Sequence, residues 1–222
     1  SSVSANTEAG FSIVGYTGDG AASGTVGHGL SSAPDMIIIK NRDTARNWTV
    51  YHSANTSAPE TDFLHLNTTN ATQDGDGAFN DTAPTSTVFS IGTSDNVNKL
   101  SDDYIAYCFH SVEGYSKFGS YTGNGSSDGT FVYTGFRPAW IMHKRTNSAT
   151  DWFMFDNRRL GYNPENHRLR ANSNGTEADA GEYDILSNGF KIRFTSGNVN
   201  ASGGTYIYMA FAEMPFKYAN AK

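Results

Sequence analysis

Two short glycine-rich stretches contain the residue types from which phosphate-binding loops are built. GSYTGNGSSDG, residues 119–129, surrounds a small polar tip with glycines, and VGYTGDG, residues 14–20, is nearly the same string. A nucleotide-binding fingerprint places GxGxxG between a strand and a helix. Here the spacing after Gly123 is GxGxxxG, strand-forming residues follow, and the loop contains no lysine. We therefore predict hairpin turns whose glycines supply positive φ angles.

Acidic residues and histidines are the next candidates for chemistry. DGDG, residues 74–77, offers two carboxylates to calcium but lacks the glutamate that ends an EF-hand loop, so we predict an acidic surface turn. The six histidines never occur at HxH or HxxxH spacing, which disfavours a metal centre. Asp179, Glu182 and Asp184 could supply a glycosidase pair, but nothing distinguishes them from a solvated loop. We predict no metal, no cofactor and no catalytic residues.

The tract DNRRLGYNPENHRLR, residues 156–170, concentrates four arginines in a chain whose formal net charge is −6. Guanidinium groups form bidentate hydrogen bonds with carboxylates and phosphates. The tract is therefore able to bind an acidic sugar or a phosphate, or to form a salt-bridge seam between two lobes. The candidate ligand-binding residues are Arg158, Arg159, Tyr162, Asn163, Asn166, Arg168 and Arg170.

The elements that position these residues follow from the composition. Only 17% of the residues are charged, and the chain has 14 Phe and 12 Tyr, which favour strands over helices. The acidic balance argues against a nucleic-acid partner, and no apolar run approaches the roughly 18 residues of a membrane span. The single cysteine, Cys108, lies in the apolar run YIAYCFH, where we predict a buried, inert thiol. These features predict an all-β protein without membrane insertion.

The chain also resembles itself at a distance of roughly 105 residues, the signature of an internal repeat. APDMIIIK aligns with RPAWIMHK, SDNVN with SGNVN, and YIAYCF with YIYMAF, always in the same order. Trp48 and Trp152 occupy equivalent places, so we expect both in hydrophobic cores. Residues that differ between the copies are the better candidates for function.

Each copy contains a series of short strands separated by turn residues. In the first copy we predict strands near 11–17, 23–28, 35–41, 47–52, 62–67, 86–91 and 103–112. In the second we predict them near 117–122, 130–135, 139–145, 151–156, 167–171, 189–194 and 205–213. The expected fold is two antiparallel β-sandwich lobes, of jelly-roll or lectin-like type, produced by duplication. The expected divisions are an extension at 1–10 and lobes at 11–118 and 119–222.

Three long strings extend the comparison beyond the chain itself. They are TVGHGLSSAPDMIIIKNR, YIAYCFHSVEGYSKFGSYTGNGSSDGTFVYTGFRPAWIM and YIYMAFAEMPFKYANAK. With them, residues 9–222 resemble a domain family of marine and other environmental bacteriophages, found in large tail or virion proteins. The resemblance carries over no catalytic residues. It implies a virion component, in a tail fibre or a host-attachment part.

The expected function is therefore non-enzymatic: loops held by β-lobes contact a host surface or a neighbouring virion subunit. The expected partners are virion subunits and a host-surface glycan, and fibres suggest a homo-oligomer, a trimer by analogy. The alternative is a dedicated carbohydrate-binding lectin, which requires a shallow groove with an exposed aromatic platform. A polysaccharide depolymerase is a third hypothesis and requires two carboxylates about 5–9.5 Å apart in a cleft.

Overall fold

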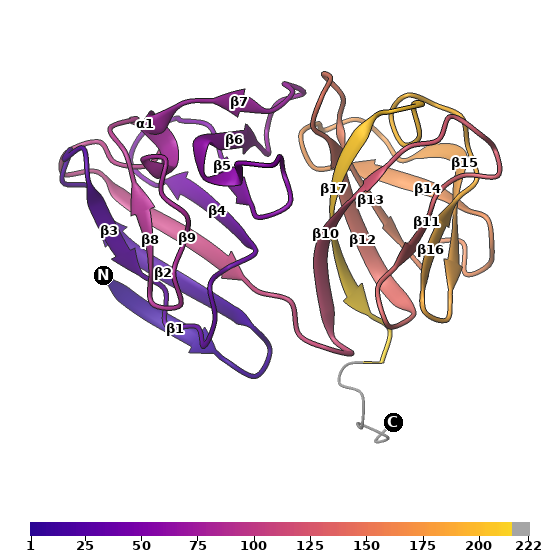
Figure 1. Ribbon diagram of the computed structural model, residues 1–222, viewed down its shortest axis with the longest axis horizontal. Coiled ribbons are helices and arrows are strands. Elements are labelled where there is room, and N and C mark those ends of the chain that lie inside the picture. The colour runs from indigo at the N-terminus through magenta and orange to yellow at the C-terminus, as the bar shows by residue number, and fades with distance from the viewer. Residues whose placement is uncertain (215–222) are drawn as a thin grey trace. The chain divides into compact units, whose positions relative to one another are not determined.

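The computed structural model describes residues 1–214, apart from the side chains of Asn166 and of residues 180–182. Its regular elements are almost all antiparallel β-strands (Figure 1). The chain divides into two compact units, and the second begins at Ser111. Among residues 1–214 no helix has the length and apolar character that crossing a membrane requires. The architecture is the all-β one that the aromatic residues predict.

Unit 1 contains a seven-stranded sheet in the order β1-β2-β9-β4-β5-β6-β7 and a two-stranded sheet, β3-β8. Side chains from both sheets and from the short helix α1 meet in one core, which includes Tyr16, Ile37, Phe79, Phe89 and Tyr104. The elements are β1 (Ser2–Asn6), β2 (Phe11–Thr17), β3 (Gly24–Gly27), β4 (Met36–Asn41), β5 (Thr49–His52), η1 (Pro59–Thr61), β6 (Asp62–His65), β7 (Gln73–Asp74), α1 (Asp76–Phe79), β8 (Val88–Ile91) and β9 (Asp103–Phe109).

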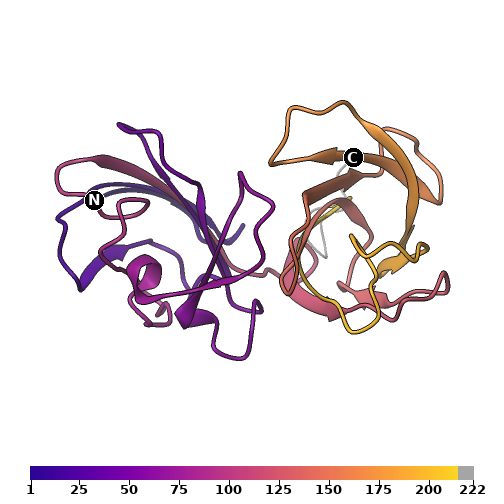
Figure 2. The ribbon, with the colours of Figure 1, turned by 90° about the horizontal axis from the view of Figure 1, so that it is seen from above.

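Unit 2 contains one eight-stranded sheet in the order β10-β17-β12-β13-β14-β15-β16-β11. The sheet curls around its own core, so that its two edge strands, β10 and β11, approach each other (Figure 2). The hydroxyl of Thr130, just before β11, donates to the carbonyl of Thr122 at the end of β10 (2.7 Å). The strands are β10 (Ser116–Thr122), β11 (Phe131–Tyr133), β12 (Pro138–Arg145), β13 (Trp152–Asp156), β14 (Glu165–Arg170), β15 (Ala178–Leu186), β16 (Gly189–Ile192) and β17 (Thr205–Ala212).

The two units repeat one order of strands. The series β2-β9-β4-β5-β6 in unit 1 corresponds to β10-β17-β12-β13-β14 in unit 2, and β3-β8 corresponds to β11-β16. In unit 2, β15 joins the two series into a single sheet, whereas β7 and α1 occupy the corresponding stretch of unit 1. A duplicated chain would have this arrangement, although the duplication itself stays an inference from the sequence.

The divisions along the chain differ from the predicted ones. Residues 1–10, expected to be an extension, include β1, which pairs with β2 from Ser2↔Gly15 to Asn6↔Phe11. The second unit begins at Ser111 and not at residue 119, because residues 112 and 116 form a β-bridge and β10 pairs with β17 from residue 116 onward. Strand β15 is not among the predicted strands either.

The two equivalent tryptophans have unequal surroundings. Trp152 is 1% exposed, as predicted, whereas Trp48 is only partly buried. Their backbone positions are nevertheless the same, since the amide of Trp48 donates to the side chain of Asn67 (2.9 Å) and the amide of Trp152 to that of Asn172 (2.8 Å). The core position predicted for both is therefore found only for Trp152.

Candidate functional site

The glycine loop of unit 2 is held by the buried side chain of Asn200. Its Oδ1 accepts from the amide of Asn124 (2.9 Å), and its Nδ2 donates to Asn124 Oδ1 (3.0 Å) and to the carbonyl of Ser126 (2.7 Å). A Cβ on Gly123 would lie 2.4 Å from a backbone carbonyl oxygen, and Gly125 has φ +71°, so both positions require glycine. We call this set of contacts the asparagine clasp.

Unit 1 contains the same clasp. Asn98 Oδ1 accepts from the amide of Asp19 (2.9 Å), and its Nδ2 donates to Asp19 Oδ1 (3.0 Å) and to the carbonyl of Ala21 (2.9 Å). A Cβ on Gly18 would lie 2.2 Å from a backbone oxygen, and Gly20 has φ +68°. The repeated string TGDG/TGNG therefore encodes one close backbone approach and one left-handed residue.

A stacked tyrosine pair supports each clasp. In unit 2 the rings of Tyr121 and Tyr206 lie 4.8 Å apart at 6°, and in unit 1 those of Tyr16 and Tyr104 lie 5.1 Å apart at 11°. The Tyr206 hydroxyl donates to a carbonyl at residue 197 (2.8 Å) and accepts from the amide at 201 (2.9 Å). The Tyr104 hydroxyl bonds equivalent backbone groups at residues 95 and 99 (both 2.8 Å).

These bonds occupy the groups that a phosphate would need. The amides of residues 123–126 donate to Gly204, Asn200 and Asn124. No amide in this run is left for an anion. The glycine loops are therefore structural, as their strand-forming neighbours predict, and any ligand would meet their exposed tips.

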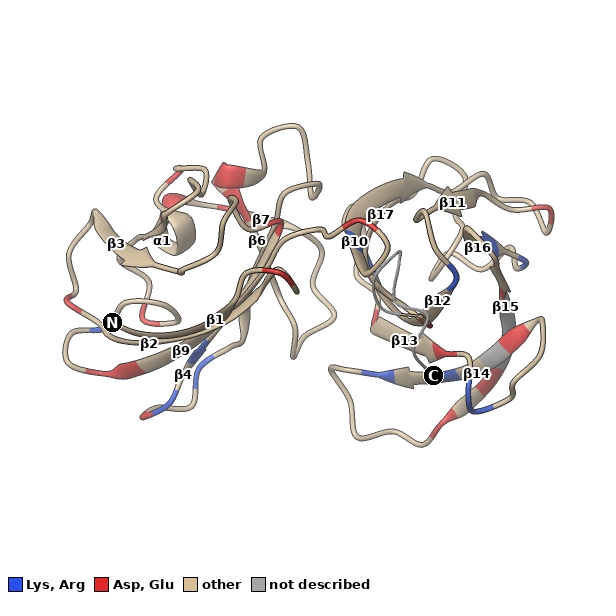
Figure 3. Ribbon diagram, turned by 90° about the horizontal axis from the view of Figure 1, so that it is seen from below, with Lys and Arg blue, Asp and Glu red and all other residues tan. Residues whose placement is uncertain are grey.

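The arginine tract forms ion pairs with neighbouring acids of unit 2. Arg159 Nε lies 2.6 Å from Asp156, and its Nη1 lies 3.0 Å from Glu177. Arg170 Nε lies 2.8 Å from Asp151. Figure 3 shows acidic residues beside the basic ones along β14 and β15. Much of the positive charge that suggested an anion site is thus balanced within the unit.

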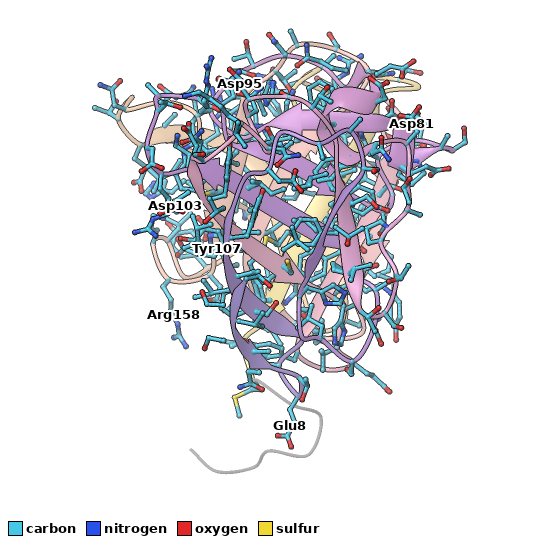
Figure 4. All side chains as sticks on the ribbon, turned by 90° about the vertical axis from the view of Figure 1, so that its left-hand side faces the viewer. Glu8, Asp81, Asp95, Asp103, Tyr107 and Arg158 are labelled. Carbon is cyan, nitrogen blue, oxygen red and sulfur yellow. The ribbon has the colours of Figure 1, made fainter. Side chains whose placement is uncertain are left out.

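The other candidate residues of the tract differ in their contacts and in their exposure. Arg168 lies over the ring of Phe153, 4.5 Å from its centroid. Asn163 bonds both the amide and the carbonyl of Ile185 (2.9 and 3.0 Å), which gives it a structural role. Arg158 points away from the ribbon (Figure 4) and is 81% exposed, with Glu213 3.7 Å away, and Tyr162 is 67% exposed.

The side chain of Asn166 lies outside the described residues. Ligand binding by this tract stays a prediction, and the two residues whose exposure suits it best are Arg158 and Tyr162.

The acidic residues that the sequence offered as candidates are likewise engaged in local contacts or lie outside the described side chains. DGDG spans the end of β7 and the start of α1, where the carbonyl of Asp76 accepts from the amide of Asn80 (2.8 Å). Asp184 pairs with Arg193 (3.3 Å), and the side chain of Glu182 lies outside the description. Within residues 1–214, excepting the few undescribed side chains, no three His, Cys, Asp or Glu side chains are arranged to hold a metal.

Among the buried titratable groups of unit 2, His143 and Glu165 escape sequence reasoning. His143 is fully buried; its Nδ1 accepts from the Tyr183 hydroxyl (2.8 Å), because its Nε2 faces a carbonyl at residue 198 (3.4 Å). Burial lowers the pKa of His143 to about 3, so the ring is neutral. Glu165 is 1% exposed, and burial raises its pKa. The only sequence signal for His143 is that its equivalent in unit 1 is Ile39.

A groove of about 430 Å³ lies where the two edge strands of unit 2 diverge. One wall is formed by Glu113 in the turn before β10 and by Lys117 on β10, and the other by Tyr133 at the end of β11 and by Gly135 just after it. Tyr133 is 65% exposed. A hollow of about 340 Å³ in unit 1 lies beside β1 and β2, but its tyrosines, Tyr16 and Tyr104, are buried.

Comparison with known proteins assigns a family but no activity. A family model described as "Domain of unknown function (DUF7483)" matches residues 1–215. The chain belongs to this family. No curated protein and no solved structure matches the chain. The function of this family member therefore has to be argued from its own geometry.

Proposed function

We propose that this chain is a non-enzymatic component of a bacteriophage particle, a tail-fibre or adhesion domain that displays loops to a host surface or a neighbouring subunit. The asparagine clasp is the observation that carries the proposal. Each unit fixes a polar, exposed loop to its core through a buried asparagine, Asn98 or Asn200. The assignment to a phage particle rests on the resemblance of the sequence strings.

Fixed loops suit recognition for an energetic reason. Ordering a flexible side chain or loop on binding costs roughly 0.5–1.5 kcal/mol for each immobilised side chain. A loop that is already held by three hydrogen bonds to one asparagine avoids part of that cost. The sheet acts as the scaffold, and the loops it connects are free to vary in sequence.

Assembly would strengthen weak contacts. We propose a homo-oligomer, a trimer by analogy with fibres, in which several copies engage one surface. Linked sites gain avidity without any new contact at each site. Light scattering coupled to gel filtration measures this directly, and a monomer at micromolar concentration would oppose the oligomeric part of the proposal.

Three experiments test the function itself. Mass spectrometry of purified particles should detect the chain, and the recombinant chain should compete with the particles for adsorption to host cells. Its absence from particles made in cells that express it would overturn the proposal. Incubation with host polysaccharide should release no reducing ends, since release would show the depolymerase activity that the proposal denies.

The second candidate function is a carbohydrate-binding lectin. The observation that favours it is the exposed ring of Tyr133 beside a groove, because a lectin requires an aromatic platform next to polar groups.

A further inference from the structure

The two exposed aromatic residues of β11, Phe131 and Tyr133, place their rings against different neighbours. A Cβ built on Gly189, which pairs with Tyr133, would lie 3.2 Å from the ring of Phe131, so the Phe131 ring covers this glycine. The ring of Tyr133 leans the other way, 3.7–3.9 Å from the equivalent position on Gly135. Phe131 therefore protects the strand pair, while Tyr133 presents its ring to the groove.

The backbone beneath Tyr133 is firmly held. The amides of Thr134 and Gly135 both donate to the carbonyl of Asn188 (3.0 and 3.2 Å). The Thr134 hydroxyl donates to the carbonyl of Phe136 (2.7 Å), and Gly135 has φ +86°. An aromatic ring on a fixed backbone loses little freedom on binding, which is why tyrosine is favoured at binding surfaces.

The opposite wall of the groove is polar, and the two charged residues that line it among residues 1–214 are of opposite sign. Glu113 and Lys117 are both exposed there, one of each sign. A carboxylate accepts hydrogen bonds and an ammonium donates them, so the wall suits hydroxyl groups, which do both. A phosphate or a uronic acid would meet repulsion from the carboxylate as well as attraction from the lysine.

We propose that this groove, which we name the Tyr133 groove, binds a neutral pyranose unit of a surface polysaccharide. The C–H face of the sugar would stack on the Tyr133 ring, whose π face is negative. The sugar hydroxyls would bond to Glu113 and Lys117. The groove falls within the size range of small-ligand sites. This inference rests on the proposed adhesion function and gives it a ligand class.

Unit 1 lacks the equivalent surface. Thr25 and Gly27 occupy the places of Phe131 and Tyr133, as their positions on β3 and their pairing with β8 show. Each chain would therefore carry one such site. Binding strength at a cell surface would come from the number of chains in the assembly.

The test is a titration of the isotopically labelled full chain followed by NMR. The neutral probes are methyl α-glucopyranoside, methyl α-mannopyranoside, methyl β-galactopyranoside and N-acetylglucosamine, and the anionic probes are glucuronic acid and inorganic phosphate. At least one neutral probe should shift the amides of residues 113–117 and 133–135. Purified lipopolysaccharide and capsular polysaccharide from the host then distinguish the two natural sources of the sugar.

Matched variants separate the ring from the fold. Tyr133→Ala should weaken binding about tenfold or more, while Tyr133→Phe, which keeps the ring, should stay within about threefold. Phe194→Ala removes another exposed aromatic ring of the same unit (41% exposed, against 65% for Tyr133), away from the groove and from the arginine tract, and should bind like the parent chain. If Tyr133→Ala loses sugar binding while Tyr133→Phe keeps it, the loss is due to the missing ring and not to the missing hydroxyl.

The inference is overturned if no neutral probe shifts these amides, if the anionic probes bind more tightly, or if Tyr133→Ala and Phe194→Ala bind equally well. These failures are distinct from failure of the proposed function. A chain that is found in particles and blocks adsorption, but binds no neutral sugar, leaves the adhesion role standing. A chain that binds sugar but is missing from particles supports the sugar site and overturns the proposed particle function.

Discussion

Replacing Asn200 with alanine tests whether the clasp holds the second unit together. The side chain is fully buried and makes three hydrogen bonds to the loop at residues 124–126. A typical hydrogen bond contributes about 1 kcal/mol net, and less is lost where water can replace the missing partner. Asn124 and Ser126 are exposed, so water reaches them once the loop moves. We expect Asn200→Ala to lower the free energy of unfolding by roughly 2–3 kcal/mol.

The variant Asn200→Asp keeps the shape but changes the chemistry. Oδ1 still accepts from the amide of Asn124, but the second oxygen faces two acceptors, Asn124 Oδ1 and the carbonyl of Ser126. A buried carboxylate in this position favours its protonated form, so its folded pKa rises above the ordinary value of about 3.9. Such a group stabilises the fold below its unfolded pKa, and the contribution is lost as pH rises through the folded pKa. The aspartate variant should therefore lose more stability near pH 7 than near pH 4.

Urea denaturation at both pH values, followed by circular dichroism, measures the free energies. Hydrogen-exchange mass spectrometry assigns the loss, which should appear in peptides covering 119–130 and not in the clasp of unit 1. Asn174→Ala, at an exposed position of the same unit, is the control and should stay within about 0.5 kcal/mol of the parent. An Asn200→Ala variant as stable as this control would refute the reasoning, as would an aspartate variant without pH dependence.

Three further outcomes follow from burial and close packing. Burial lowers the pKa of His143 to about 3, while an unfolded histidine titrates near 6.5, so unit 2 should lose stability as pH falls below about 6.5. The variant His143→Ile, which copies Ile39 of unit 1, should reduce that loss when unfolding is measured in urea at several pH values. Burial raises the pKa of Cys108 to about 12, so a disulfide reagent should label it only in denaturant; rapid labelling of the folded chain would contradict its burial. Gly123→Ala should lower the melting temperature, since the clash with a backbone carbonyl costs about 1–3 kcal/mol, whereas Gly175→Ala in an exposed loop should not.

Sequence patterns predict most strands because buried and exposed residues alternate along them. β2, with Val14 and Tyr16 buried and Ile13 more exposed, shows this alternation clearly. β1 escapes prediction because all five of its residues are exposed, so no apolar pattern marks it. β15 escapes prediction because its described core residues, Tyr183 and Ile185, lie among acidic residues and a glycine, which hide the apolar pattern. The first copy also has no matching strand to reveal it.

The candidate site is harder to predict because its partners come from distant parts of the chain. The arginines suggest an anion site, but two of their neutralising acids, Asp151 and Glu177, lie outside the tract, just before β13 and β15. No periodicity reveals such pairs. Tyr133 has a weak signal in the sequence, since unit 1 has Gly27 at the same place. A comparison of the two copies could have found it, but only the structure shows that the ring lies beside a groove.

The final strand of each unit lies in the interior of its sheet, β9 between β2 and β4, and β17 between β10 and β12. During synthesis on the ribosome, neither sheet can close until that strand has emerged. Unit 1 is complete once Phe109 has left the exit tunnel, but unit 2 must wait for Ala212. A product that stops before Thr205 leaves β10 and β12 with bare edges, which invite aggregation. Incomplete chains would thus aggregate rather than accumulate as folded protein.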